Sequence, residues 1–233
     1  MKKNDEQPFG KLWELHPMWS QLTDEEKELL DQEVEIATYK RNEIIHSEGD
    51  EPTHVMMVVK GKVRIYKEGI GQKPQIIRIL KPYDFFAYRA VIAGDKYNSC
   101  ASAFEPCVIC KLKKEIFMEL IRHNSHACFV VMEILSRDLA VSELQTVNLT
   151  QKHIRGRLAE TLLNLKKNHG LEDDGATLGI YISREDIANM SNMTTSNAIR
   201  TLSQFASEGL ITVDGRKIKL LNEEEIKRIS RLG

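Results

Sequence analysis

The chain has 233 residues, of which 42% are hydrophobic and 29% are charged, and this composition predicts a globular protein of one large or two modest domains. The formal net charge at neutral pH is −1, so the chain as a whole is no electrostatic binder of nucleic acid, and any DNA contact must come from a local patch. No apolar run approaches the length of a membrane span, and the polar N-terminus MKKNDEQPFG has no apolar signal core. We therefore expect a cytoplasmic protein that does not enter a membrane.

The cysteines and histidines do not form the patterns that metal centres need. Among the four cysteines Cys100, Cys107, Cys110 and Cys128, only Cys107 and Cys110 have the C-x-x-C spacing. In the strand predicted around them they would point to opposite faces, and a metal or cluster site needs more ligands than one pair supplies. The seven histidines show no ligand spacing such as H-E-x-x-H. We predict core cysteines, no metal or iron–sulfur site, and no enzymatic activity.

The first half of the chain changes from a helical to a strand pattern. Residues 1–40 are predicted to be helical, with a helix start at Thr23 and a capping box that Glu26 completes. Short strand patterns, separated by glycine and proline, then favour a β-barrel or roll; they lie at 42–46, 53–59, 62–66, 75–80 and 106–112. Residues 84–96 (DFFAYRAVIAGDK) predict a short helix that Gly94 ends.

The longest helical stretch, residues 125–150, carries a coiled-coil seam. Its members recur at alternating four- and three-residue steps, which predicts a parallel dimer helix: Cys128, Met132, Leu135, Leu139, Ser142, Thr146 and Leu149. The polar members of the seam can set register or meet a ligand. A second apolar stripe is expected to pack on the roll: Val131, Ile134, Val141 and Leu144. A core helix within a single chain is the alternative.

After a further amphipathic helix that ends near Gly170 and an acidic loop at 171–175, residues 183–221 predict a winged helix-turn-helix. Ser183 and Thr194 are expected to cap its two helices, and Asn192 suits the left-handed turn between them. The second helix is predicted to bury Ala198, Ile199, Leu202, Phe205 and Ala206, and to expose Thr195, Ser196, Asn197, Arg200, Thr201 and Gln204. The strands 210–213 and 217–221 form a hairpin at Asp214-Gly215, and an amphipathic tail follows.

Two amphipathic helices and a hairpin with a purely structural role are the alternative, but no acid lies between Thr194 and Ser207. The predicted DNA-contacting residues are Thr194, Thr195, Ser196, Asn197, Arg200 and Gln204 on the second helix, and Arg216, Lys217 and Lys219 on the wing. Arg200 can donate two hydrogen bonds to guanine. Strand alternation places Lys217 and Lys219 on one face, where we expect them to contact phosphates.

The order of a β-roll, a long helix and a winged helix-turn-helix resembles the Crp–Fnr superfamily of bacterial transcription regulators across essentially the whole chain. The motifs that carry the resemblance are EGD (48–50), VKGKV (59–63), DFF (84–86) and GRLAETLL (156–163). The resemblance implies an α+β fold: an N-terminal antiparallel β-roll (a double-stranded β-helix, cyclic-nucleotide-binding-like), a long dimerisation helix and a C-terminal winged helix-turn-helix. We predict a sensing domain at 1–124, the dimerisation helix and hinge at 125–150, and the DNA-binding domain at 151–233.

The resemblance also implies a homodimer that reads a pseudo-palindromic operator, contacts RNA polymerase and binds an effector between the roll and the long helix. The cyclic-AMP-responsive branch holds its ligand with a Gly-Glu pair, an Arg-Ser or Arg-Thr pair and a Thr-Ser pair. The aligned positions here read Ala87-Tyr88, Asn98-Ser99 and Ser142-Glu143. The oxygen-sensing branch needs four cysteine ligands, most of them near the N-terminus, whereas the first cysteine here is Cys100.

Neither sensor chemistry carries over, so the effector is an unidentified small molecule or a redox signal, and not cyclic AMP bound in the usual way. The pocket residues implied are Tyr88, Arg89, Tyr97, Asn98, Ser99 and Ser142. For Arg89, a surface or inter-domain salt bridge is the alternative. The recognition positions, commonly Arg or Thr, then Glu, then Arg in the family, read Thr195, Ser196 and Arg200 here, so we expect a different half-site.

The leading hypothesis is therefore a dimeric, sequence-specific DNA-binding transcriptional regulator. A cyclic-nucleotide-binding regulatory module attached to another activity is the alternative, and an enzyme is the third candidate. The sequence leaves open the effector, the operator and its genes, the direction of regulation, and whether any cysteine is redox-active.

Overall fold

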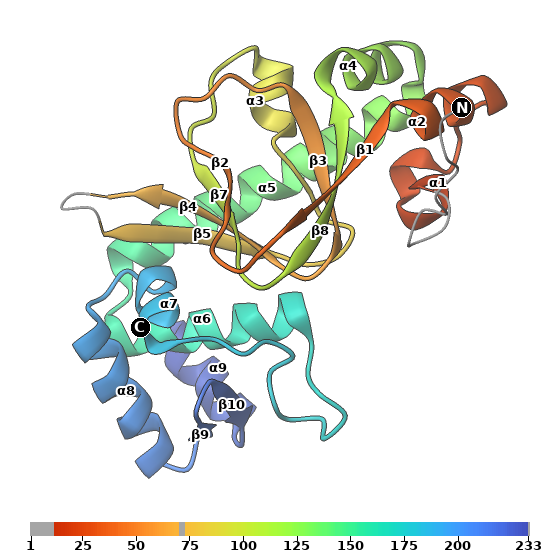
Figure 1. Cartoon of the computed structure of the whole chain (residues 1–233). Coiled ribbons are helices and arrows are strands. Elements are labelled where there is room, and N and C mark those ends of the chain that lie inside the picture. Colours follow the sequence, from red (N-terminus) through yellow and green to blue (C-terminus); the bar gives the residue numbers. More distant parts are fainter. Residues whose placement is uncertain (1–11, 70–72, 233) are drawn as a thin grey trace. The chain divides into compact units, whose positions relative to one another are not determined.

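The computed structural model of the protein describes residues 12–69 and 73–232 (Figure 1). The chain divides into two compact units. The first comprises Met1–Lys67 and Ile79–Ala140, and the second comprises Glu68–Arg78 and Val141–Gly233. The domain boundaries predicted from the sequence stay predictions. None of the helices in the described parts of the chain combines the length and the apolar character that crossing a membrane requires.

The first unit begins with short helices: α1 (Leu12–Leu15), a 3-10 helix at Pro17–Trp19, and α2 (Asp24–Glu33). The predicted capping box is confirmed, because Thr23 Oγ1 accepts from the backbone N–H of Glu26 and the Glu26 side chain accepts from the backbone N–H of Thr23. Residues 1–11 of the predicted helical stretch lie outside the described residues.

The prediction that helix extends to residue 40 is wrong, because Val34–Tyr39 forms strand β1. This strand pairs antiparallel with β8 (Cys107–Lys113), in a register that sets Val34 opposite Leu112 and Tyr39 opposite Cys107. Val34, Ile36 and Thr38 are β-branched, and such side chains fit a sheet surface better than a helix. The long-range partner strand therefore outweighs the helical pattern read locally.

Two four-stranded antiparallel sheets form the β-roll, and Figure 1 shows their strands wrapping around one another. One sheet has the order β1-β8-β3-β6 and the other the order β2-β7-β4-β5. The remaining strands are β2 (Ile44–His46), β3 (His54–Lys60), β4 (Val63–Glu68), β5 (Pro74–Leu80), β6 (Phe85–Phe86) and β7 (Cys100–Ala103). The predicted strands are thus present, whereas β1, β6 and β7 were not predicted.

Gly61 shows why the β3–β4 turn, the VKGKV motif, requires a glycine. Its φ is 80°, in the left-handed region, and a Cβ there would lie 2.3 Å from the backbone oxygen of Pro106. Any other residue would have to displace backbone that leads into β8.

Helices α3 (Tyr88–Ala93), α4 (Lys114–His123) and the first part of α5 (Ser125–Gln151) pack with the roll around a shared core. The largest fully buried side chains of this core include Trp19 and Phe117. The prediction of core cysteines is confirmed for Cys100, Cys107 and Cys110, and Cys128 is half-buried. Burial raises the pKa of the Cys107 thiol to about 11 and that of Cys110 to about 12, so both stay protonated at neutral pH.

The second unit contains the end of α5 and helices α6 (Ile154–His169), α7 (Arg184–Met190), α8 (Thr195–Ser207) and α9 (Glu223–Leu232). Its hairpin consists of β9 (Ile211–Asp214) and β10 (Lys217–Leu220). The segment after the acidic loop adds to this hairpin, since Leu178 donates its backbone N–H to the Ile218 carbonyl and Leu220 donates to Ala176. The wing is therefore tied along one edge to residues that precede α7.

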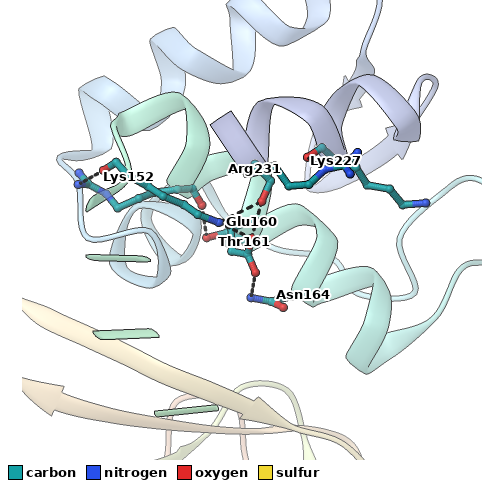
Figure 2. A network of polar contacts seen from close by, with 8 residues as sticks. Lys152, Glu160, Thr161, Asn164, Lys227 and Arg231 are labelled. Carbon is teal, nitrogen blue, oxygen red and sulfur yellow. Dashed lines mark hydrogen bonds and ion pairs between the residues drawn. The ribbon is translucent and has the colours of Figure 1, made fainter. Parts of the chain in front are cut away.

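A polar network joins α6 to the end of α5 and to α9. Figure 2 shows Glu160 of α6 at its centre. Lys152 Nζ donates to Glu160 at 2.8 Å, and the Ser230 hydroxyl of α9 donates to the same carboxylate oxygen. Burial alone would raise the pKa of Glu160, but the hydrogen bonds from Lys152 and Ser230 outweigh it and lower the pKa. Glu160 is therefore ionised, and it links α6 to α9 and to Lys152, which directly follows α5.

Candidate nucleic-acid interface and effector region

The helix-turn-helix is defined by two caps and a turn, all three as predicted. Ser183 Oγ accepts from the backbone N–H of Asp186 at 3.0 Å and caps α7. Thr194 Oγ1 accepts from the backbone N–H of Asn197 at 3.2 Å and caps α8. Between the helices, Asn192 has a φ of 49°, the left-handed conformation that asparagine tolerates. These local signals fix the point where α8 begins and the direction in which it leaves the turn.

Arg157 of α6 donates hydrogen bonds to the backbone of this turn. Its Nε donates to the Ser191 carbonyl at 3.0 Å, and its Nη2 donates to the Asn192 carbonyl at 3.2 Å. These carbonyls follow the last turn of α7, where backbone acceptors lack helical partners. The guanidinium satisfies both of them, so the arginine of the GRLAETLL motif positions the recognition helix through the turn.

The face that α8 buries differs in part from the predicted one. Ala198, Leu202 and Phe205 are buried as predicted. Thr201 was predicted to be exposed and is buried; its hydroxyl donates to the Asn197 carbonyl at 2.8 Å, which leaves only its methyl group to pack. Ile199 and Ala206, predicted to be buried, are exposed; they lie two helical turns apart on one side of α8.

The polar side chains predicted to contact DNA lie on the outer part of α8. Arg200 is exposed, and its Nη2 donates to Asn197 Oδ1 at 2.8 Å. This contact orients the guanidinium along the helix and leaves further N–H donors for a guanine edge. The other exposed members of the predicted set on or next to α8 are Thr194, Thr195, Ser196 and Gln204, while Asn197 is half-buried.

The two lysines predicted to contact phosphates are engaged by the acidic loop that precedes α7. Lys217 Nζ lies 3.9 Å from Glu172 Oε2 and 4.9 Å from the ring centre of Tyr181. Lys219 Nζ lies 3.1 Å from Asp174 Oδ2. The pairs are 45 positions apart in the chain, so the sequence patterns gave no sign of them. A phosphate that approaches these ammonium groups meets carboxylates already in place.

Both acids are held in position by further hydrogen bonds. Asp174 Oδ1 accepts from the backbone N–H groups of Thr177 and Ala176 at 2.8 and 3.0 Å, and these bonds hold the pKa of its carboxyl well below the usual range. Glu172 Oε1 accepts from the Tyr181 hydroxyl at 2.5 Å. Lys217 has a raised pKa because of Tyr181 and Glu172. Hydrogen bonds and ion pairs thus place Glu172 and Asp174 of the acidic loop beside the wing.

The turn of the wing carries a different pair of cations. β10 begins at Lys217, whose partner is Asp214, so the two turn residues are Gly215 and Arg216. Arg216 is exposed, and Arg184, the first residue of α7, donates from Nη1 to the Gly215 carbonyl. Sequence reasoning missed Arg184; its place directly after the Ser183 cap, at a helix N-terminus, was the available signal. Arg184 therefore contacts the wing turn, of which the exposed Arg216 is the second residue.

In the first unit, the residues implied for an effector pocket differ in exposure. Tyr88 is buried, and its hydroxyl donates to a carboxylate oxygen of Asp138 on α5. Ser99 is also buried, whereas Arg89 and Asn98 are exposed. A neutral hydroxyl bonded to an acid therefore occupies the position that the resemblance assigns to a ribose-binding glutamate. Asp138 was not predicted; it lies between two seam positions on a helix read only for its apolar pattern.

Tyr97, the remaining pocket residue of this unit, lies inside the roll. Its ring stacks on His46 with a centroid distance of 3.9 Å and an interplanar angle of 21°. His46 also stacks on Phe86 at 6.3 Å. Burial lowers the pKa of His46 to about 4, so the imidazole is neutral at physiological pH. Like Arg184 and Asp138, His46 was not selected by the sequence patterns. Ser142 belongs to the second unit and is exposed.

Helix α5 exposes a long apolar surface. Met132, Leu139 and Leu149 of the predicted seam are exposed, as are Ser142 and Thr146, while Cys128 and Leu135 are half-buried. Phe129 and Val147 add to the exposed apolar side chains. For the second stripe, packing is confirmed for Val131 and Ile134, which join the core of the first unit. The prediction that Val141 and Leu144 pack on the roll is wrong, because both side chains are exposed and the core includes no residue of α5 beyond Leu135.

Comparison with known proteins identifies the two halves. A model of the cyclic nucleotide-binding domain matches residues 36–124, and a model of the Crp-like helix-turn-helix domain matches residues 156–229. A cyclic nucleotide-binding domain combined with a Crp-like helix-turn-helix domain indicates a DNA-binding transcriptional regulator. The chain belongs to the Crp–Fnr family of such regulators.

Individual relatives are distant but cover most of the chain. The CRP-like cAMP-activated global transcriptional regulator of Mycobacterium tuberculosis is 20% identical over 87% of this chain and 91% of its own. The cAMP-activated global transcriptional regulator CRP of Pasteurella multocida is 26% identical over 76% of this chain and 85% of its own. The structure of FixK2 from Bradyrhizobium japonicum superposes with a TM-score of 0.76 at 22% identity, covering 84% of this chain and 96% of that protein.

Proposed function

We propose that this regulator acts as a homodimer that recognises a specific operator through α8. We further propose that an effector other than cyclic AMP controls its activity. The observation that carries the DNA-reading part is the outer face of α8, which presents short polar side chains and Arg200. Such side chains pair with base edges in a major groove. Arg184 and Arg216 at the corner of the wing supply phosphate contacts that place the helix.

The dimer is supported by the surface of α5. Met132, Leu139 and Leu149 are exposed in the single chain at positions that a parallel coiled coil would bury. Two recognition helices at a fixed separation then read two half-sites of one pseudo-palindrome. Contact with RNA polymerase and a cytoplasmic location follow from the way regulators of this family work, and we propose no catalytic role.

The proposal on the effector rests on Tyr88 and Asn98. These residues occupy the positions that the cyclic-AMP-responsive branch gives to a carboxylate and to the phosphate-binding arginine. Burying a cyclic phosphate needs a cation or a dense set of donors. Tyr88 is instead bonded to Asp138, an acid that would repel a phosphate nearby. A less charged molecule fits these groups better.

Binding-site selection with the full-length protein and random duplex DNA tests the function. We expect a two-fold symmetric consensus. Arg200→Ala should weaken operator binding by about 1–3 kcal/mol and relax the preference at one base pair of each half-site. The selection of no sequence at all would refute the proposal.

Calorimetry with cyclic AMP and cyclic GMP tests the proposal on the effector. We expect no micromolar binding of either nucleotide to the wild-type protein. Tight binding that Asn98→Ala or Ser99→Ala abolishes would contradict it, and would favour a cyclic-nucleotide-binding module.

A further inference from the structure

Ile199 is the large apolar side chain that the recognition helix exposes. Its side chain is 49% exposed, although a helix of this kind buries its apolar residues against the domain core. Ala198, Leu202 and Phe205 already fill that role. Ile199 is therefore not one of the residues that anchor α8 in the core, and about half of its surface faces solvent in the free protein.

The neighbours of Ile199 on the helix surface are short and polar. Thr195 and Ser203 lie one turn before and one turn after it, Ser196 lies three residues before it, and all three are exposed. Arg200 follows it directly, about 100° around the helix axis. Ile199 thus stands among the side chains that would face base edges when α8 occupies a major groove, with no bulky neighbour to cover it.

The major-groove edges of the bases present one apolar group, the C5-methyl group of thymine. The other groups at these edges are hydrogen-bond donors and acceptors, which an isoleucine can only desolvate without compensation. An exposed branched alkyl group on a reading helix therefore favours a thymine and disfavours the other bases at the position that it reaches.

We propose that Ile199 is a specificity-determining residue that reads the methyl group of a thymine in the operator half-site. The inference rests on the proposed function, because it requires α8 to enter the major groove. Because Ile199 and Arg200 are adjacent on the helix, the thymine lies close to the guanine that Arg200 contacts. In the half-site, the apolar contact of Ile199 with thymine would therefore lie next to the bidentate hydrogen bonds of Arg200 with guanine.

The test replaces thymine by deoxyuridine, which removes only the methyl group. Duplexes carry this replacement at one thymine at a time in one half-site of the selected operator. At one position next to the base pair read by Arg200, deoxyuridine should weaken binding by the wild-type protein about fourfold, the fold-change for one buried carbon unit of about 0.8 kcal/mol. Ile199→Ala should bind the thymine duplex more weakly and no longer distinguish the two.

Thr195→Ser is the matched control, because Thr195 carries a methyl group on the same exposed face. This variant should keep the deoxyuridine effect at the Ile199 position. A deoxyuridine effect that persists unchanged in Ile199→Ala, or that Thr195→Ser removes, would overturn the assignment. The absence of any such position in an otherwise specific operator would also overturn it. A failure to select any operator would instead refute the proposed function. Ile199 is exposed, so its replacement should leave the thermal unfolding midpoint unchanged.

Discussion

Neutralising the acidic loop should convert the wing into a stronger phosphate-binding element. The relevant changes are Glu172→Gln and Asp174→Asn, which remove the charges opposite Lys217 and Lys219. Both replacements keep a side-chain oxygen, so the acceptor for the Tyr181 hydroxyl and the acceptor for the backbone N–H groups after Asp174 remain. The loop should therefore keep its shape and lose only its competition with phosphate.

The expected magnitude follows from counterion release. Each phosphate contact contributes about 0.9 to the slope of log affinity against log salt concentration. Two lysines released to phosphates steepen this slope by about 1.8 units. Between 50 and 200 mM salt, the double variant should then lose about twelve times more affinity than the wild-type protein loses. At the low-salt end it should bind every duplex, specific or random, more tightly than the wild-type protein.

Fluorescence anisotropy titrations over this salt range, with operator and random duplexes, measure the effect. Asp173→Asn is the matched control, because this exposed acid of the same loop changes the net charge as Asp174→Asn does and forms no ion pair within the described residues. Asp174→Asn should steepen the slope more than Asp173→Asn. Equal slopes for these two variants would mean that net charge alone acts. An unaltered slope in the double variant would mean that the lysines do not reach DNA, and either result would refute the reasoning.

Three further changes test the proposed dimer, the buried His46 of the roll and the polar network around Glu160. Leu139→Lys should give a folded monomer by light scattering that loses tight operator binding, because Leu139 is 62% exposed in the single chain and a dimer seam would bury the new charge; a dimer would contradict the seam. The pKa of His46 is lowered to about 4, so the unfolded state binds a proton that the folded state does not. Stability should therefore be full above pH 6.5 and fall by up to about 3 kcal/mol towards pH 4, and His46→Gln should flatten this dependence in urea unfolding. Glu160→Gln should lower the unfolding free energy by about 1–3 kcal/mol, because Lys152 loses its charged partner, whereas Glu224→Gln on the exposed side of α9 should have little effect.

Local chemistry explains which parts of the fold the sequence could predict. The capping box at Thr23, the caps at Ser183 and Thr194 and the turn at Asn192 depend on residues within one turn of each other, and they were predicted correctly. Strand β1 was not, because its pairing with β8 joins residues that lie more than 60 positions apart. No periodicity within residues 34–39 reveals that partner. The roll as an architecture was predictable from its turns, whereas the membership of each sheet was not.

The same distinction applies to the candidate site. The position of α8 and the exposure of Arg200 on its outer face could be predicted from the helix pattern. The pairing of Lys217 and Lys219 with the acidic loop, and the bond from Tyr88 to Asp138, require the tertiary structure. Ile199 was misread because an apolar residue next to Ala198 continues the buried pattern in the sequence. At 100° per residue, however, one step along a helix is enough to leave the core.

The charge distribution of the DNA-binding unit has a consequence for how this regulator finds its operator. Non-specific binding to DNA comes almost entirely from phosphate contacts, and its strength rises with the number of free cations. Here the chain carries a net charge of −1, and carboxylates of the same domain engage both wing lysines. We therefore expect a low affinity for random DNA, which the acids set without changing the base contacts proposed for α8. Discrimination depends on the ratio of specific to non-specific affinity. A phosphate contact strengthens both affinities alike, so carboxylates that engage the wing lysines should lower the overall strength of binding and leave discrimination to the base contacts proposed for α8.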